Sequence, residues 1–249
     1  MGIIVKSQAE IALMREAGRI VAVTLETLAR AIKPGVATAE LDIIAEREIR
    51  SRKGTPSFKG YRGFPASICV SINDEVVHGI PGKRMVKEGD IVSLDVGAIF
   101  EGFQGDAAVT VPVGKVSAGA QALLDATRGA LDAGIAAARD KARLGDVSAA
   151  IQLYVESRGF SIVREYVGHG IGRDMHEDPQ VPNFGEPGTG PVLRKGMTLA
   201  LEPMVNAGGW RTRVNSNKWT VRTVDGSLSA HFEHTIAIGA GQAEILTKP

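Results

Sequence analysis

Two acidic residues lie inside neighbouring β-strand patterns, and this feature constrains the fold more than any other. The apolar run 91–100 carries Asp95 at its centre, and the run 105–113 carries Asp106. The turn signal Glu101-Gly102 between them predicts a β-hairpin. If Glu101-Gly102 is the two-residue loop, the carboxylates are diagonal neighbours on one face; if the loop lies one residue earlier, they face each other directly. In both registers two like charges share a face, so an arginine, a shared proton or a cation has to compensate them.

Further carboxylates and one imidazole repeat this pattern. Glu202 ends the run Met-Thr-Leu-Ala-Leu, and Glu233 precedes the run His-Thr-Ile-Ala-Ile. His169 stands in a run of three glycines, which leaves its ring unhindered and the backbone free to turn sharply. This run is not a nucleotide-binding loop, because its spacing is not G-x-G-x-x-G. Four carboxylates and one imidazole suit Mn, Fe(II), Co or Zn, and four negative charges balance two divalent ions. The set therefore predicts a two-metal hydrolytic site.

The order of predicted elements repeats along the chain. A capping box, Ser7-x-x-Glu10, starts a first helix that Lys33-Pro34-Gly35 ends, and a second helix runs from Thr38 to Gly54. Strand patterns follow at 66–72, 91–100 and 105–113. Helices are predicted again at 117–139 and 148–158, with Leu144-Gly145 as the break between them, then strands at 161–167, 198–202, 219–223 and 235–238. We therefore expect an α+β fold of two similar halves that share one sheet, with helices covering one side and the site between the halves.

Composition excludes several classes of protein. One cysteine among 249 residues allows neither an internal disulfide nor a cysteine-based zinc site. The net charge of +1 gives no reason to expect the whole chain to wrap nucleic acid or an anionic membrane. The sequence has no apolar stretch of membrane-spanning length and no secretory signal at its start, so the cytoplasm is the expected location.

With this set of residues and this order of elements, the sequence resembles the type I methionine aminopeptidases of the pita-bread metallopeptidase family. The resemblance runs nearly end to end. Its segments are Ile-Cys69-Val-Ser-Ile-Asn-Asp-Glu-Val-Val-His78-Gly-Ile-Pro, Asp90-Ile-Val-Ser-Leu-Asp95-Val, Gly105-Asp106, Tyr166-Val-Gly-His169-Gly-Ile-Gly, Met175-His176-Glu-Asp-Pro, Leu201-Glu202-Pro-Met and Ser229-Ala-His-Phe-Glu233-His-Thr. It implies the pita-bread fold, in which two pseudo-symmetric halves share one curved, mainly antiparallel sheet. We expect one catalytic domain, 1–249, with halves of roughly 1–115 and 116–249.

The resemblance also implies the chemistry. The metal ligands would be Asp95, Asp106, His169, Glu202 and Glu233, with both aspartates touching or bridging two ions of Co, Mn, Fe(II) or Zn. A metal-bridging hydroxide would attack the first peptide carbonyl of a chain that begins with methionine, preferably one with a small second residue. Glu202 would shuttle the proton to the leaving amine, His78 would contact the scissile amide, and His176 would stabilise charge on the carbonyl oxygen.

The substrate side is implied in the same way. The methionine slot would be lined by Tyr61, Cys69 and Trp219, with Phe58 and Met175 at its wall, and with His78 and His176 also touching substrate. Phe58 replaces a smaller residue of some family members and Met175 an aromatic one, which puts the shape of the slot in question. Expected partners are nascent polypeptide N-termini and, transiently, the ribosome; we expect a monomer that binds neither membranes nor specific nucleic-acid sequences.

Two other functions remain open at this point. Related peptidases that cut next to proline, such as proline dipeptidases and X-Pro aminopeptidases, share the five ligands but commonly carry an additional N-terminal domain. A pita-bread binding module without metals would have lost ligands, whereas all five positions, His78 and His176 are filled here.

Overall fold

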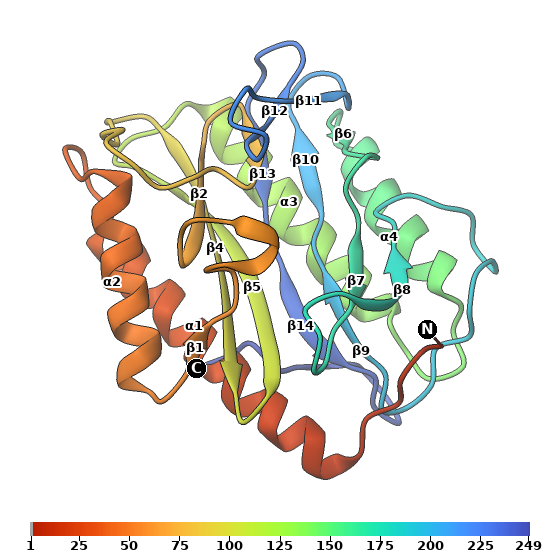
Figure 1. The fold of residues 1–249 in the computed structure, drawn as a ribbon. Coiled ribbons are helices and arrows are strands. Elements are labelled where there is room, and N and C mark those ends of the chain that lie inside the picture. The colour runs from red at the N-terminus through yellow and green to blue at the C-terminus, as the bar shows by residue number, and fades with distance from the viewer. Residues whose placement is uncertain (1) are drawn as a thin grey trace.

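The first half of the chain begins with two helices, whose starts are set by capping. The computed structural model describes residues 2–249. Helix α1 spans Gln8–Ala31, and Ser7 and Glu10 form the predicted capping box at its start. Helix α2 spans Thr38–Ser51, where the Glu40 carboxylate accepts a hydrogen bond from the Ala37 backbone N–H. Both helices pack their apolar faces against strands β2 (Ile68–Ile72), β4 (Ile91–Phe100) and β5 (Phe103–Pro112). Figure 1 shows them along one edge of the molecule.

The predicted hairpin forms, and the structure decides between its two registers. Strand β4 spans Ile91–Phe100 and β5 spans Phe103–Pro112, so the loop is Glu101-Gly102. Both loop residues have positive φ, 49° and 78°, as tight hairpin turns require. Asp106 faces Gly97, two positions beyond Asp95. The carboxylates are therefore diagonal neighbours on one face, and the directly opposed register is wrong.

The second half repeats the helix pair with one difference from prediction. Helix α3 spans Ala118–Ala137 and is capped by Ser117, and α4 spans Leu144–Glu156. The predicted start of α4 at Ser148 is about one turn too late. The Asp146 carboxylate accepts a hydrogen bond from the Arg143 N–H and so starts the helix there. Gly145 does not break the helix; a Cβ at this position would lie 2.3 Å from the Glu186 carbonyl oxygen, so glycine permits a close contact.

The remaining strands are short. In chain order the elements not yet named are β1 (Thr55–Pro56), the 3₁₀ turn Tyr61–Gly63, β3 (Glu75–Val77), β6 (Ser161–Ile162), β7 (Gly168–Gly170), β8 (Glu177–Val181), β9 (Thr198–Leu201), β10 (Met204–Asn206), β11 (Thr212–Val214), β12 (Val221–Thr223), β13 (Ser229–His231), β14 (His234–Ala237) and β15 (Glu244–Ile245). The strand predicted at 161–167 is reduced to two residues, and the sequence did not predict β1, β3, β7, β8, β10, β11, β13 and β15.

Every strand pairing in the described residues is antiparallel, and the strands form several short sheets rather than one continuous ladder. The two halves are joined where β5 meets the chain between β13 and β14. There the backbones of Ala108 and Glu233 exchange N–H···O hydrogen bonds of 2.9 and 3.4 Å. In Figure 1 the strands of both halves consequently lie side by side in one curved layer.

Each half has its own apolar core between its helix pair and its strands. One cluster is built on α1 and α2, and a second on α3 and α4. The α+β class and the helix–strand repeat are thus confirmed. Because the helices occupy one side of the layer, the other side is left for the acidic residues of β4, β5 and the second-half strands. Over residues 2–249, no helix has the length and apolar character needed to cross a membrane.

Candidate metal centre

The β4–β5 hairpin supplies the two aspartates of the site. Asp95 is only 9% exposed to solvent and Asp106 only 5%. The backbone of Asp106 is tied to the other half of the chain, because its N–H donates to the Thr235 hydroxyl (3.0 Å) and its carbonyl accepts from the same hydroxyl (2.8 Å). A side chain at Gly97, opposite Asp106, would lie 2.7 Å from the Phe58 ring, so glycine leaves room for that aromatic wall.

The second half supplies the histidine and both glutamates. His169 lies at the centre of β7, Glu202 follows β9, and Glu233 lies between β13 and β14. The glycines beside His169 do not make the sharp turn that we expected, because neither has a positive φ. They permit close packing instead: a Cβ at Gly168 would lie 2.4 Å from the Ala200 carbonyl oxygen, and one at Gly170 would lie 2.2 Å from that of Asp178.

The tautomer of His169 follows from the contact of its ring with the Gly170 backbone. Nδ1 lies 2.9 Å from the Gly170 carbonyl oxygen, which can only accept, so Nδ1 carries the proton. Burial lowers the pKa of His169 to about 3, so the ring is neutral. Nε2 then presents a lone pair 3.6 Å from Oε1 of Glu202, another acceptor. Two acceptors that face each other in a buried site need a proton or a cation between them.

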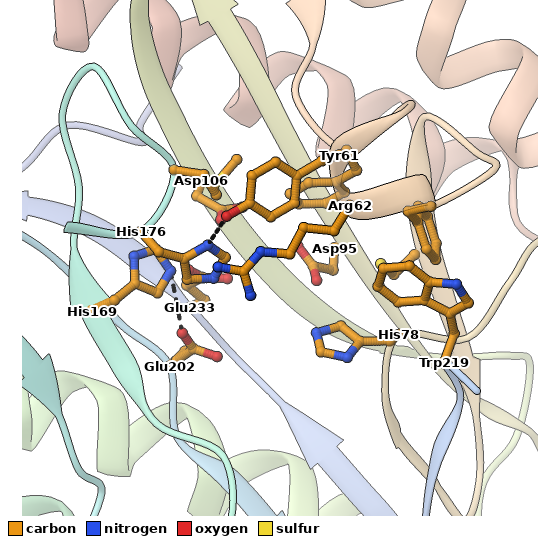
Figure 2. A pocket seen from close by; sticks show the side chains of 14 residues that line it. Tyr61, Arg62, His78, Asp95, Asp106, His169, His176, Glu202, Trp219 and Glu233 are labelled. Atoms are coloured by element: carbon orange, nitrogen blue, oxygen red, sulfur yellow. Dashed lines mark hydrogen bonds and ion pairs between the residues drawn. The ribbon is translucent and has the colours of Figure 1, made fainter. Parts of the chain in front are cut away.

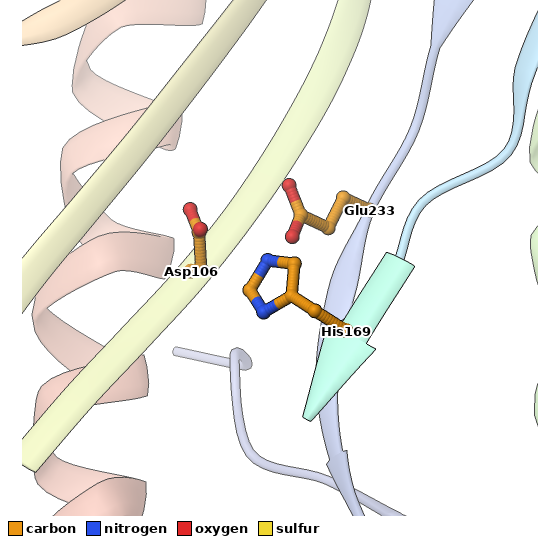
Figure 3. Close-up of side chains that lie close together, drawn as sticks. All are labelled: Asp106, His169 and Glu233. Atoms are coloured by element: carbon orange, nitrogen blue, oxygen red, sulfur yellow. The ribbon is translucent and has the colours of Figure 1, made fainter. Parts of the chain in front are cut away.

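The buried acids meet in the centre of the site. Asp106, His169 and Glu233 each offer one ligand atom, and these atoms lie within 4.8 Å of one another; Figure 3 shows the three side chains pointing toward a common point. Burial raises the pKa of Asp95 to about 7. It also raises the pKa of Asp106, with added repulsion from Glu233, and that of Glu202, with added repulsion from Asp106. Without a cation these carboxyls would therefore favour their protonated forms, and a bound cation would replace those protons.

Unpaired atoms test whether this cluster fits a metal. Oδ1 of Asp95, Oδ1 of Asp106 and Oε1 of Glu233 are buried and have no hydrogen-bond partner among residues 2–249. Most buried polar groups in proteins have a partner, so orphaned carboxylate oxygens need an explanation. Oxygen ligands with one imidazole are the donor set of hard to borderline divalent ions. The residues therefore fit a divalent metal.

One cavity of about 170 Å³ brings all the predicted site residues together, and Figure 2 shows the side chains that line it. It is lined by Phe58, Tyr61, Cys69, His78, Asp95, Asp106, His169, Met175, His176, Glu202, Trp219 and Glu233. Arg62 and Phe64 line it too, and sequence reasoning missed both. The glycines on either side of Tyr61-Arg62 were the available signal, since Gly60 and Gly63 have positive φ and turn this segment toward the cavity.

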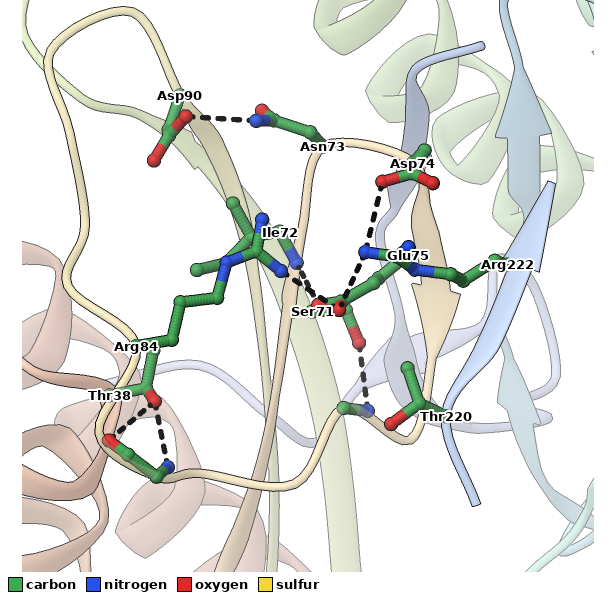
Figure 4. A network of polar contacts seen from close by, with 12 residues as sticks. Thr38, Ser71, Ile72, Asn73, Asp74, Glu75, Arg84, Asp90, Thr220 and Arg222 are labelled. Atoms are coloured by element: carbon green, nitrogen blue, oxygen red, sulfur yellow. Dashed lines mark hydrogen bonds and ion pairs between the residues drawn. The ribbon is translucent and has the colours of Figure 1, made fainter. Parts of the chain in front are cut away.

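The loop after β3 presents His78 from the first half. His78 has a positive φ of 59°, an uncommon conformation that its surroundings have to hold. The next N–H, that of Gly79, donates to the Ser71 hydroxyl at 3.1 Å. Figure 4 shows the anchor of the loop: Glu75 accepts from Arg84 (2.8 Å) and from Arg222 (3.3 Å). These ties fix where the imidazole of His78 enters the cavity.

His176 approaches the acids from the opposite wall. Its Nδ1 lies 2.8 Å from the Tyr61 hydroxyl, and its ring lies 4.3 Å from that of His169, centroid to centroid. Burial lowers the pKa of both His176 and His78, the latter to about 4. Both rings are therefore neutral near pH 7 and can donate one hydrogen bond each to a substrate.

An apolar slot adjoins the acids. Phe64 and Trp219 meet edge to face at 5.1 Å. Cys69 is paired directly with Asp95 across β2 and β4, and burial raises the pKa of its thiol, so it acts as a small neutral wall residue. Met175 is buried against Phe58 and Tyr61. A slot of this composition suits a flexible apolar side chain next to a charged centre.

Comparison with known proteins gives a consistent result. The model of metallopeptidase family M24 matches residues 12–240. Methionine aminopeptidase 1 of Bacillus subtilis is 55% identical over 246 residues, covering 99% of both chains. Methionine aminopeptidase 1 of Mycobacterium tuberculosis is 49% identical over 249 residues, covering 97% of this chain and 94% of its own.

Solved structures agree with the sequences. The crystal structure of methionine aminopeptidase from Thermotoga maritima superposes with a TM-score of 0.99 at 51% identity, covering all of both chains. Prolidase from Pyrococcus furiosus superposes with a TM-score of 0.81 at 20% identity, and the match covers 99% of this chain but 66% of that one. The prolidase likeness shows a shared pita-bread fold and nothing further.

Proposed function

The chain belongs to metallopeptidase family M24, and from this premise we propose that it is a methionyl aminopeptidase, a hydrolase that removes the first methionine from polypeptides with a small second residue. One observation carries the proposal: the unpaired buried acids and the apolar slot of Phe64, Cys69 and Trp219 open into the same cavity. A cavity of about 170 Å³ has room for one side chain and the atoms of one peptide bond, not for a folded segment.

Two divalent ions would be held by Asp95, Asp106, His169, Glu202 and Glu233. The three orphaned oxygens and the free Nε2 of His169 support this ligand set. When bound, such a pair would supply a hydroxide nucleophile near neutral pH and polarise the scissile carbonyl. The same set serves Co, Mn, Fe(II) and Zn, so availability in the cell decides which is used.

The protein's own groups would orient the substrate and move its protons. Glu202 would take the proton of the attacking water and pass it to the leaving amine, a role supported by its buried carboxylate with a raised pKa. His176 would donate a hydrogen bond to the carbonyl oxygen as negative charge develops there, and its contact with Tyr61 holds the ring for this purpose. His78 would contact the amide nitrogen from the opposite wall.

The slot would select methionine. Phe58, Tyr61, Met175 and Trp219, together with Phe64, present ring and thioether surface around Cys69. A methionine sulfur against aromatic rings gains about 0.3–1.5 kcal/mol beyond area burial. The free α-amino group of the substrate, in its neutral form, would coordinate a bound metal ion, which would restrict cleavage to the first residue of a chain.

We further propose that residues 1–249 act as one catalytic domain, with halves of roughly 1–115 and 116–249, because the site takes ligands from both. A cytoplasmic monomer that meets nascent chains at the ribosome, without sequence-specific nucleic-acid contacts, is consistent with the net charge of +1 and the single buried cysteine.

A peptide panel tests the activity. The metal-free chain, loaded in turn with Mn, Co, Fe(II) or Zn, is given Met-Gly-Ser, Met-Leu-Ser, N-acetyl-Met-Gly-Ser and Ala-Pro-Ser, and release of the first residue is followed by mass spectrometry. We expect rapid cleavage of Met-Gly-Ser alone. Cleavage of Ala-Pro-Ser only would indicate a proline-directed peptidase, and no cleavage with no bound ion would indicate a binding module.

A further inference from the structure

His231 is a buried polar residue that the proposed mechanism does not use. It ends β13, two residues before Glu233, and is 2% exposed. Its Nε2 has no hydrogen-bond partner among residues 2–249. This nitrogen lies 3.8 Å from Oε2 of Glu202 and 3.9 Å from Oε2 of Glu233. It thus stands between the two glutamates that different strands bring to the metal centre.

The backbone fixes the place of this ring. The His231 N–H donates to the Thr110 hydroxyl and its carbonyl accepts from the same hydroxyl, both at 2.8 Å. The Ser93 hydroxyl contacts Thr110 at 2.8 Å and holds it in turn. A ring held in this way cannot move to solvent to satisfy Nε2, although an unpaired buried donor costs about 1–3 kcal/mol. Its partner therefore has to come from inside the site.

The two carboxylate oxygens of Glu202, and likewise those of Glu233, face different neighbours. Oε2 of both glutamates faces His231, while Oε1 of Glu202 faces His169 and Oε1 of Glu233 is unpaired. A neutral imidazole has one N–H, and on Nε2 that N–H would meet two acceptors. A small rotation of either carboxylate brings its Oε2 within hydrogen-bond distance. The other oxygen of each glutamate is then left directed into the acidic centre.

We propose that His231 is a positioning residue whose Nε2–H donates to the Oε2 atoms of Glu202 and Glu233 and so orients the two carboxylates for metal binding. The inference rests on the proposed metal centre. Groups that hydrogen-bond to metal ligands fix ligand orientation, and their loss commonly lowers metal affinity about 10–100-fold. His231 differs from His169 in this respect, because its nitrogen is offered to the ligands and not to the ion.

Calorimetric titration of the metal-free full chain with Mn(II) tests this role. The wild type is compared with His231→Leu, His231→Gln and His234→Leu. His234 is a matched control: it is the adjacent partly buried histidine, but its Nδ1 contacts the Thr247 hydroxyl. We expect His231→Leu to weaken Mn(II) binding about 10–100-fold at unchanged stoichiometry. His231→Gln should regain most of that affinity, because its amide can donate from a similar place, and His234→Leu should bind as the wild type does.

A second measurement separates positioning from folding. Metal-free His231→Leu should still melt in one cooperative transition, because the hydrogen bonds of its backbone to Thr110 remain, while the visible spectrum of its Co(II) form should change. Wild-type affinity in His231→Leu, or equal losses in the Gln and Leu variants, would overturn the inference. Loss of one whole ion from His231→Leu would overturn it too and make His231 a ligand. A wild type that binds no ion would instead overturn the proposed function and the inference with it.

Discussion

The hydroxyl of Thr235 is the contact whose removal we expect to weaken the junction of the two halves most cleanly. It accepts the Asp106 N–H at 3.0 Å and donates to the Asp106 carbonyl at 2.8 Å, and Thr235 is 0% exposed. Thr235→Val replaces the hydroxyl by a methyl group of similar size. The change leaves both backbone groups of Asp106 buried without this partner, and it opens no cavity.

The expected loss follows from these contacts. A buried N–H left without a partner costs about 1–3 kcal/mol, and the lost hydrogen bond to the carbonyl costs about 1 kcal/mol more, so Thr235→Val should lower the free energy of unfolding by about 2–4 kcal/mol. For a chain of this size each kcal/mol shifts the melting temperature by about 2–4 °C. Metal affinity should fall as well, because the substitution frees the strand that carries Asp106.

Urea unfolding of the metal-free protein, followed by circular dichroism, measures this loss. Thr24→Val is the matched control: Thr24 is also 0% exposed, but its hydroxyl donates only to the Ile20 carbonyl of its own helix. Thr235→Ser, which keeps the hydroxyl, should lose only the contribution of one buried methyl, about 1 kcal/mol. If Thr235→Val lies within about 0.5 kcal/mol of the Thr24→Val variant, the hydroxyl does not hold the halves together as argued.

Three further predictions concern the role of His176, the pH dependence of metal binding and the buried ion pair of Lys6. His176→Ala should lower kcat on Met-Gly-Ser about 10²–10³-fold with unchanged metal stoichiometry, and loss of bound ions in calorimetry would contradict its role as an oxyanion donor. Because the pKa of Asp95 is raised to about 7, a metal ion has to displace its proton below that pH. Chelator competition should therefore show the affinity for Mn(II) falling at least about tenfold for each pH unit below 7. An affinity that does not change with pH would disprove the role of this proton. Lys6→Met leaves Glu177 as an unpaired buried charge and should lower the free energy of unfolding by about 3–5 kcal/mol, whereas Arg15→Met at an exposed ion pair should change it by less than about 1 kcal/mol.

Local signals predicted much of the fold. The Ser7–Glu10 capping box starts α1 where the sequence predicts, and the Glu101-Gly102 turn signal marks the β4–β5 loop. The hairpin register stayed open because a loop shifted by one residue also gives a plausible two-residue turn. The structure decides it through two adjacent residues with positive φ, which is a backbone property that side-chain patterns do not display.

Glycine was the main source of error, because the same residue serves two purposes. At Gly145 and Gly170 we expected a helix break and a sharp turn, and the structure has the first turn of α4 and the strand β7. In both places a neighbouring backbone oxygen lies where a Cβ would be, at 2.3 and 2.2 Å. Those oxygens belong to segments about 40 and 8 residues away along the chain, so no local pattern could reveal the contact.

The site could be predicted to a similar extent. Charged residues in apolar strands are conspicuous in a sequence, and the structure gathers all of the proposed ligands around one cavity. Arg62, Phe64 and His231 carry no such contrast: an arginine in a turn, a phenylalanine near a proline and a histidine in a strand are ordinary. Their position at the site is visible only in the folded structure, where chain segments from both halves surround one cavity.

That convergence explains why the acids are tolerated at the boundary between the halves. Asp95 and Asp106 come from one half, and His169, Glu202 and Glu233 from the other, so their repulsion acts across the junction that Thr235 and Thr110 hold. Burial and mutual repulsion raise the pKa values of carboxyls at this junction, among them Asp106 and Glu233. Without a cation these carboxyls would stay protonated, because protonation costs less than burying several negative charges side by side. Ion binding would replace that repulsion by attraction across the same boundary. The halves should therefore be more tightly coupled with ions bound than without, and hydrogen exchange at the Ala108–Glu233 backbone pair should slow on metal loading.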